Sequence, residues 1–210
     1  LISMLDPQGE YTQLKAVSSD TVVVDFDMKT LIFDIKTKMI PVTADPSDTT
    51  LKTTDFTVRW YMKLASGFNP SYEAKAPTNG VGFFTTERSA KRRITRFSTT
   101  RDATNAAPVK YYIKNVPEEF KKTFAKAMDS WNKEFSAVLG YDLLRYEFVD
   151  AGDERAELLV PGDIRFNIIE WDLVNKAGYG GLGPSIANQH TGETMSANVL
   201  IQGPTIVKLY

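Results

Sequence analysis

The chain has 210 residues, 42% of them hydrophobic, which is enough to bury a core in one large domain or two small ones. Its formal net charge of −1 provides no overall field that would attract nucleic acid or a membrane surface. The absence of cysteine excludes disulfides, thiolate metal sites and a cysteine nucleophile, and no apolar run is long enough for a transmembrane helix.

The first hundred residues are predicted to be mainly β-strand. Residues 21–26 are β-branched and apolar, and Asp27-Met28-Lys29 can turn the chain into a second strand that starts at Thr30 and extends toward Val42. Alternation of apolar side chains predicts a third strand over residues 56–64.

The segments between and after these strands are less regular. Residues 44–50 are rich in Asp, Ser, Thr and Pro and predict a loop, and residues 66–79 predict a broken surface segment. A further short strand is expected over residues 81–86. The composition of residues 98–107, rich in Ser, Thr, Asn and Ala, suggests a linker between two domains.

A basic segment precedes this linker, with five positive side chains within residues 87–96. Such a cluster could hold phosphate groups, as in a nucleic-acid binder. A solvated edge strand is the better interpretation, because the whole chain is close to neutral and no base-stacking platform accompanies the arginines. A protease-sensitive site between two domains is a third interpretation.

A long amphipathic helix is predicted over residues 117–140. Pro117 suits a first helical turn, Glu118 and Glu119 favour the positive end of the helix dipole, and Gly140 can end the helix in a left-handed conformation. Six side chains recur at helical spacing and form a stripe that we expect to lie in the core against a sheet: Phe120, Phe124, Met128, Trp131, Phe135 and Val138.

Strands are predicted on both sides of this helix, over residues 109–113, 143–149, 163–171 and 195–201. A charged loop over 150–157 and a glycine-rich turn over 176–183 connect the later strands. A strand, a helix and a strand in succession imply a parallel crossover. The sequence therefore predicts an α+β chain: a β-rich N-terminal domain over residues 1–100, then a domain over 108–210 with a mixed twisted sheet and one long helix.

Few side chains suggest catalysis. His190, the one histidine, is better read as a surface turn residue than as a metal ligand. Glu170 and Asp172 share one face of a predicted strand, with Asp163 nearby, and a solvated face is a better interpretation than an acid–base pair. Ser130 and Ser185 have no histidine at a plausible spacing, and the glycine-rich turn lacks the Lys-Ser/Thr and the helix of a phosphate loop.

Three segments together resemble the upper, N-terminal half of the catalytic domain in metzincin-type zinc metalloproteases. The first leads from Tyr111-Tyr112-Ile113 through Pro117 into the helix that carries Trp131-Asn132-Lys133-Glu134-Phe135; the second is DIRFNIIEW at residues 163–171. The third comprises GYGGLGPS at 178–185, HTGET at 190–194 and ANVLI at 197–201. The closest similarity is to a bacterial group with a β-rich domain before the protease. It covers about residues 80–210, and more weakly the part before them.

The resemblance implies a zinc helix with the motif His-Glu-x-x-His-x-x-Gly-x-x-His, whose glutamate acts as general base on a zinc-bound water. This sequence has no such motif, so no catalytic residue and no metal ligand can be assigned to it. In the family order the zinc helix would follow Tyr210. The chain begins at Leu1 and ends on an apolar pattern, so we expect it to be a piece of a longer polypeptide.

One element of the site can be assigned by resemblance. The last strand before the zinc helix is expected to be an antiparallel edge strand, which pairs its backbone with an extended substrate. The residues expected to bind substrate are those of this strand and of the glycine loop beside it: Ser196, Ala197, Asn198, Val199, Leu200, Gly180 and Gly181.

The resulting hypothesis is a portion of a periplasmic or secreted zinc metallopeptidase. Its parent would bind a peptide or protein substrate and zinc, whereas this chain alone would bind no zinc and be inactive, and would need the remainder of the protease domain. No nucleic acid and no membrane span are expected. The alternative hypothesis is a non-catalytic, protein-binding or prodomain-like module.

Overall fold

A computed structural model of the chain describes residues 11–41, 54–78, 82, 84–86, 91–101, 107–173 and 180–209. The chain forms two compact units, Leu1–Gly67 and Phe68–Tyr210. The predicted loop at residues 44–50 and the first half of the predicted glycine-rich turn, residues 176–179, lie outside the described residues.

The first unit is a three-stranded antiparallel sheet in the order β1-β2-β3. β1 (Tyr11–Asp25) and β2 (Thr30–Pro41) are joined by a tight turn, in which Lys29 has a positive φ of 50° and the Asp25 side chain accepts a bond from the Met28 N–H. β3 (Thr54–Lys63) pairs with the other side of β2. The two predicted strands with their turn, and the third strand, are therefore confirmed, although β1 begins at Tyr11, well before the predicted start at residue 21.

The two faces of this sheet differ in chemistry. One face carries Asp34, which accepts two hydrogen bonds of 2.8 Å from Arg59. The strand register brings only apolar side chains together in the middle of the opposite face: Val22, Val24, Leu31, Phe33, Ile35, Val58, Trp60 and Met62. Val22 and Met62 are 62% and 53% exposed, so this apolar face is open to solvent.

The second unit contains the predicted long helix. Its regular elements are β4 (Val109–Lys114), α2 (Glu118–Leu139), β5 (Leu144–Val149), β6 (Asn167–Asp172), β7 (Gly181–Leu182), β8 (Ser185–Ala187), β9 (Thr194–Gln202) and α3 (Gly203–Leu209). The 3₁₀ turns are η1 (Ala65–Gly67), at the end of the first unit, and η2 (Glu154–Glu157), after β5. The predicted α+β fold, with one long helix and a mixed sheet, is confirmed.

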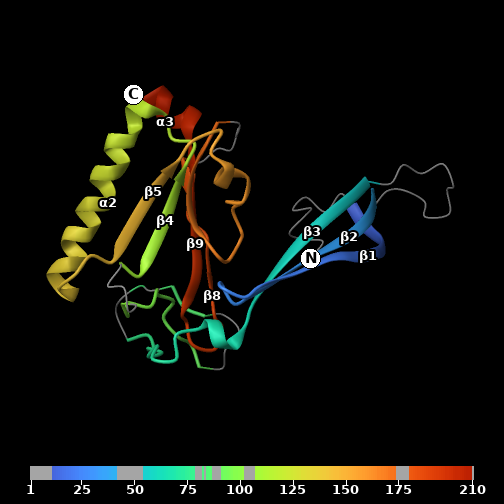
Figure 1. Ribbon diagram of the computed structural model, residues 1–210, viewed down its shortest axis with the longest axis horizontal. Coiled ribbons are helices and arrows are strands. Elements are labelled where there is room, and N and C mark those ends of the chain that lie inside the picture. The colour runs from blue at the N-terminus through green and yellow to red at the C-terminus, as the bar shows by residue number, and fades with distance from the viewer. Residues whose placement is uncertain are drawn as a thin grey trace. The chain divides into compact units, whose positions relative to one another are not determined.

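The sheet of the second unit has the order β5-β4-β6-β9-β7, and β8 also pairs with β9. β4 is parallel to β5, as the strand–helix–strand pattern predicts. β6 is parallel to β4 and to β9, which the pattern did not predict. Figure 1 shows α2 running alongside β5 and β4. The core between this helix and the sheet centres on Ile113, Val116, Met128, Ile169 and Trp171.

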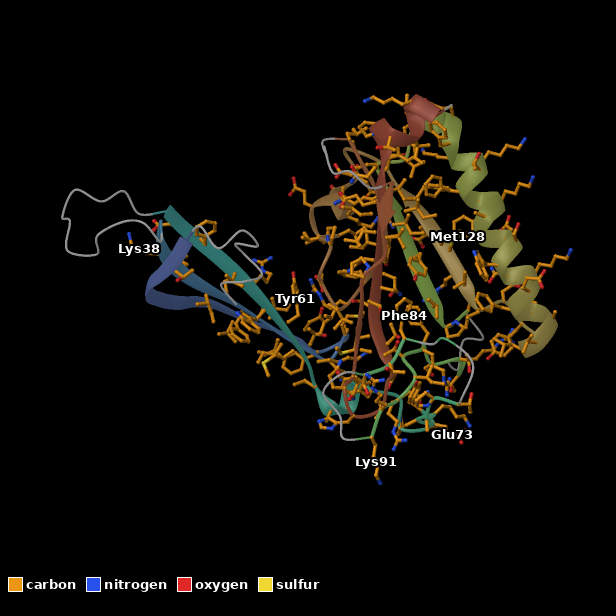
Figure 2. All side chains as sticks on the ribbon, turned by 180° about the vertical axis from the view of Figure 1, so that it is seen from behind. Lys38, Tyr61, Glu73, Phe84, Lys91 and Met128 are labelled. Carbon is orange, nitrogen blue, oxygen red and sulfur yellow. The ribbon has the colours of Figure 1, made fainter. Side chains whose placement is uncertain are left out.

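The predicted limits of α2 are correct, but half of its apolar stripe does not face the sheet. The helix follows Pro117, and Gly140 ends it with a left-handed φ of 78°. Met128 and Asn132 are its buried residues, and Figure 2 shows the Met128 side chain directed toward the strands. Trp131 and Val138, which the sequence assigned to the core, are 60% and 84% exposed, whereas Phe120 and Phe124 in the first half of the helix pack against the core.

Three other expectations differ from the structure. Within residues 81–86 the described positions form only an isolated bridge, from Thr85 to Ile94. β6 begins at Asn167, because Asp163 and Arg165 close a turn in which the Asp163 carboxylate accepts bonds from the Arg165 backbone and guanidinium. The compact units divide after Gly67, upstream of residues 98–107, because residues 69–96 bond to the second unit.

Within the parts of the chain that the structure describes, no helix is both long and apolar enough to cross a membrane.

Candidate functional site

The predicted substrate strand lies inside the sheet and is not a free edge. β9 pairs with β6 in parallel through residues 198–202 and, on its other side, with β7 and β8 in the antiparallel direction. The prediction that residues 196–201 form an antiparallel edge strand is therefore wrong. Ser196 and Asn198 are also buried, so they offer no surface to a substrate.

The edge of this sheet is made by β7 and β8, which together run along β9. Asn198 donates its N–H to the Pro184 carbonyl, and Gln202 donates to Gly180, so the two short strands form one interrupted edge over residues 180–187. The interruption lies at Pro184, which has no N–H to return to β9. Gly180 and Gly181, two of the predicted binding residues, do belong to this edge.

Backbone groups along this edge are available to another strand. In an antiparallel ladder, alternate residues direct N–H and C=O toward the partner. Because Gly180 and Pro184 bond to β9, the intervening residues Gly181, Gly183 and Ser185 direct theirs outward. Every residue from 180 to 186 is exposed, so this row of donors and acceptors faces solvent.

The side chains beside this edge differ between its two faces. Leu182 and Ile186 share one face and are 53% and 37% exposed, whereas Gly181, Gly183 and Ser185 share the other. Gly181 also approaches β9 closely, since a Cβ there would lie 3.0 Å from the Leu200 carbonyl oxygen. At Gly183 the corresponding distance to the Asn198 oxygen is 3.9 Å, an ordinary contact.

The remaining carboxylates serve structural contacts. Glu170 lies 3.7 Å from Lys114, and Asp172 accepts a bond of 3.3 Å from the buried Gln202 amide. The two side chains share one face of the strand, as predicted, and this is the face opposite α2, while Trp171 lies on the helix face. Asp163 is bound to Arg165 in a separate turn, so the three carboxylates do not form a cluster.

Within the described part of the chain, three buried polar atoms of β9 have no hydrogen-bond partner: Ser196 Oγ, Asn198 Oδ1 and Gln202 Oε1. Their residues are spaced along one face of the strand, so the atoms belong to separate places in the sheet. Such atoms usually bond to ordered water.

The turn before β9 contains a buried carboxylate, whose charge acts on a tyrosine from an earlier segment of the chain. Glu193 is 7% exposed and accepts a 3.3 Å bond from the Asn69 N–H. Burial raises the pKa of Tyr72, while the Arg96 guanidinium, 4.7 Å from the centre of its ring, lowers it, and the Glu193 charge raises it again. These contacts hold Asn69, Tyr72 and Arg96 near the turn.

Other candidate residues are dispersed. His190 lies in an exposed turn, where its N–H bonds to the Asn188 side chain at 2.8 Å. Ser130 donates to the Lys126 carbonyl within α2. In the basic segment, Lys91 is exposed and directed away from the strands (Figure 2), and Arg96 bonds to the Glu73 carbonyl at 2.7 Å.

A cavity of about 550 Å³ lies between α2, α3 and the helix-facing side of β6 and β9. Its lining is mostly apolar and includes a stacked pair, Phe120 and Trp171, with ring centres 4.9 Å apart. The lining residues are Glu119, Phe120, Thr123, Phe124, Trp171, Ile201, Ile206 and Val207. The sequence pattern did not reveal this cavity, because its walls come from α2, α3, β6 and β9, which are far apart in the chain.

Zinc was expected for the parent protein and not for this chain. Among the residues that the structure describes, no three His, Cys, Asp or Glu side chains lie close enough to hold a metal ion. The described donors therefore do not fit zinc, and no chemical step can be derived through it.

The edge strand could have been recognised from Gly181-Leu182-Gly183-Pro184-Ser185-Ile186, because proline within a strand is confined to sheet edges. The glycines favoured the interpretation as a turn instead. Comparisons do not decide what this edge binds: no family model matches the chain, and no curated protein or solved structure does.

Proposed function

We propose that the second unit is the substrate-binding part of a zinc-dependent metallopeptidase of the metzincin type, periplasmic or secreted. In this proposal the chain holds an extended peptide along the β7–β8 edge, and the remainder of the protease domain supplies zinc and the general base. The observation that supports it is the solvent-facing antiparallel edge on an otherwise parallel sheet.

The edge would bind a peptide by adding a strand to the sheet. Gly181, Gly183 and Ser185 would exchange backbone hydrogen bonds with alternate residues of the peptide. Such bonds depend on the extended backbone of the peptide and not on its side chains.

Side-chain preference would arise from the two faces of the edge. Peptide side chains on the Leu182 and Ile186 face would contact apolar surface, and those on the other face would meet only glycine and serine. We expect apolar residues at alternate peptide positions on the first face and larger residues to be accepted on the second.

The second candidate function is a non-catalytic peptide-binding module. The observation that favours it is the lack of a metal donor set among the described side chains. The edge would bind peptide in the same way, but no hydrolysis would follow.

The test uses the natural polypeptide that contains these residues, together with the 210-residue chain. The peptidase proposal predicts that the natural polypeptide carries zinc, and that a chelator stops its hydrolysis of unfolded casein. It also predicts no tightly bound zinc and no hydrolysis for the 210-residue chain. Peptide binding without chelator-sensitive hydrolysis in the natural polypeptide would support the binding module instead.

A further inference from the structure

The cavity between α2, α3 and the sheet is separate from the β7–β8 edge. Its lining residue Ile201 lies on the sheet face that packs against α2, whereas Leu182 and Leu200, which pair across β7 and β9, lie on the opposite face. Figure 1 shows α3 beside the end of α2 at which that helix begins. A ligand bound in this cavity would therefore not depend on the proposed peptidase function.

The size of this cavity is that of a ligand site and not of a packing fault. Voids in protein cores rarely exceed one water molecule, which occupies about 30 Å³ in the liquid. This cavity measures about 550 Å³, within the range of small-molecule sites. Water in it contacts mostly apolar side chains, so an apolar ligand that displaces the water gains free energy.

One wall of the cavity is aromatic. Phe120 stacks on Trp171 with ring centres 4.9 Å apart, and Phe124 meets the same indole edge-on at 6.2 Å. Trp171 is only 2% exposed, so the core holds its ring in place. Aromatic rings pack well on such a wall in offset-stacked or edge-to-face geometry, which favours a ligand with a ring of its own.

The start of α3 holds another wall in place. A Cβ at Gly203 would lie 2.1 Å from Trp171 Nε1, so only glycine lets the helix begin this close to the indole. Ile206 and Val207 of α3 then complete the apolar lining. A site whose walls are already in position loses little entropy when a ligand binds.

The polar lining residues both come from α2. Glu119 and Thr123 are four positions apart, which places them on the same side of the helix. The neighbouring Glu118 pairs with Lys121 at 2.8 Å, whereas Glu119 forms no ion pair with any residue in the described ranges. A ligand ammonium group would pair with the Glu119 carboxylate and would also donate to the Thr123 hydroxyl.

We propose that this cavity binds a small aromatic amine, with its ring against the aromatic wall and its ammonium group paired with Glu119. The apolar walls select the ring, and the carboxylate selects positive charge over negative charge. An acid with the same ring would be repelled, and an uncharged molecule would gain only the apolar contacts.

Isothermal titration calorimetry of the 210-residue chain compares three ligands that share an indole ring. Tryptamine carries an ammonium group, ethylindole is uncharged, and indolepropionate carries a carboxylate. We expect one-to-one binding of tryptamine, about fivefold weaker binding of ethylindole and at least tenfold weaker binding of indolepropionate. Added salt should reduce the difference between tryptamine and ethylindole, because it screens the ion pair with Glu119.

Variants assign the binding to this cavity. Glu119→Gln should bind tryptamine and ethylindole equally. Glu118→Gln is the matched control, because this carboxylate is 85% exposed and does not line the cavity, and it should keep the preference for tryptamine. Val207→Trp and Thr123→Trp add bulk to the cavity from α3 and from α2, and each should weaken tryptamine binding at least tenfold. Both positions are exposed, so circular dichroism should show unchanged folding.

The proposal is overturned if tryptamine shows no saturable binding, or if indolepropionate binds as tightly as tryptamine. Glu119→Gln that retains the preference for tryptamine over ethylindole would also overturn it. So would unchanged affinity for tryptamine in both tryptophan variants, because the amine would then bind elsewhere on the chain.

Discussion

At the scale of single residues, one buried polar side chain determines how α2 meets the sheet. Asn132 bonds to both the N–H and the C=O of Leu144, where β5 begins. It thereby sets the register between the helix and the strand that follows it. The hydrophobic pattern placed Trp131 in the core and passed over Asn132, because periodicity scores apolar residues and cannot foresee a hydrogen bond between elements distant in the chain.

We predict that Asn132→Ala lowers the free energy of unfolding by about 2 kcal/mol, since it leaves two partly buried backbone groups without a partner. Lys133→Ala, at the exposed neighbouring position, should change stability by less than about 0.5 kcal/mol. Urea denaturation followed by circular dichroism compares the two variants. Equal stability of both would refute the role of the Asn132 bonds.

A second prediction concerns Asp34 and the acid stability of the first unit. The hydrogen bonds from Arg59 lower the pKa of Asp34, while burial acts to raise it. A folded-state pKa below the unfolded one contributes stability above about pH 4, and this contribution disappears as the pH falls through the folded pKa.

Asp34→Asn should therefore cost about 1 kcal/mol at neutral pH, a modest value because Arg59 is 54% exposed, and progressively less below about pH 4. Asp55→Asn, in an exposed pair with Lys38, is the control and should change little. Denaturation as a function of pH provides the measurement. A loss of stability in Asp34→Asn that grows as the pH falls would contradict a lowered pKa of Asp34 in the folded state.

At the scale of elements, composition and periodicity predicted most strands and the long helix. Pro117, the paired glutamates and Gly140 defined α2, and the apolar, β-branched runs predicted β2, β9 and the end of β1. The pattern could not predict that β9 is paired on both sides, because strand order depends on pairing between segments far apart in the chain. The edge role therefore belongs to β7 and β8.

The difference in burial between Met128 and Trp131 gives a prediction within one helix. Met128→Ala should cost about 2–4 kcal/mol, because it leaves a cavity in the core, whereas Trp131→Ala should cost less than about 1 kcal/mol. The larger residue is thus expected to matter less to stability. Thermal or urea unfolding of both variants measures this, and a larger loss for Trp131→Ala would place the stripe in the core after all.

At the scale of the whole molecule, the position of the boundary between the units has consequences. Residues 69–96 bond to the turn before β9 through Asn69 and Arg96, although their composition resembles a separate domain. The amino-acid composition of the chain changes near residue 100, whereas the boundary between the two compact units lies after Gly67.

We therefore predict that a fragment of residues 68–210 keeps the unfolding midpoint that the second unit has in the full chain. A fragment of residues 108–210 should unfold at a lower urea concentration, because it lacks the bonds from Asn69 and Arg96 to that turn. Equal midpoints for the two fragments would mean that residues 69–96 add nothing to the second unit.

The central claim is that the β7–β8 edge accepts an extended peptide, and backbone amide NMR tests it most directly. An acetylated hexapeptide of alternating valine and threonine is titrated into the chain, with its N-methylated analogue as the matched peptide control. Gly181→Val should weaken binding because of the close Leu200 oxygen, and Gly183→Ala much less. We predict that the largest shifts fall on the amides of Gly181, Gly183 and Ser185, and that N-methylation abolishes them. Shifts confined to other strands, or equal binding of the methylated peptide, would contradict the account.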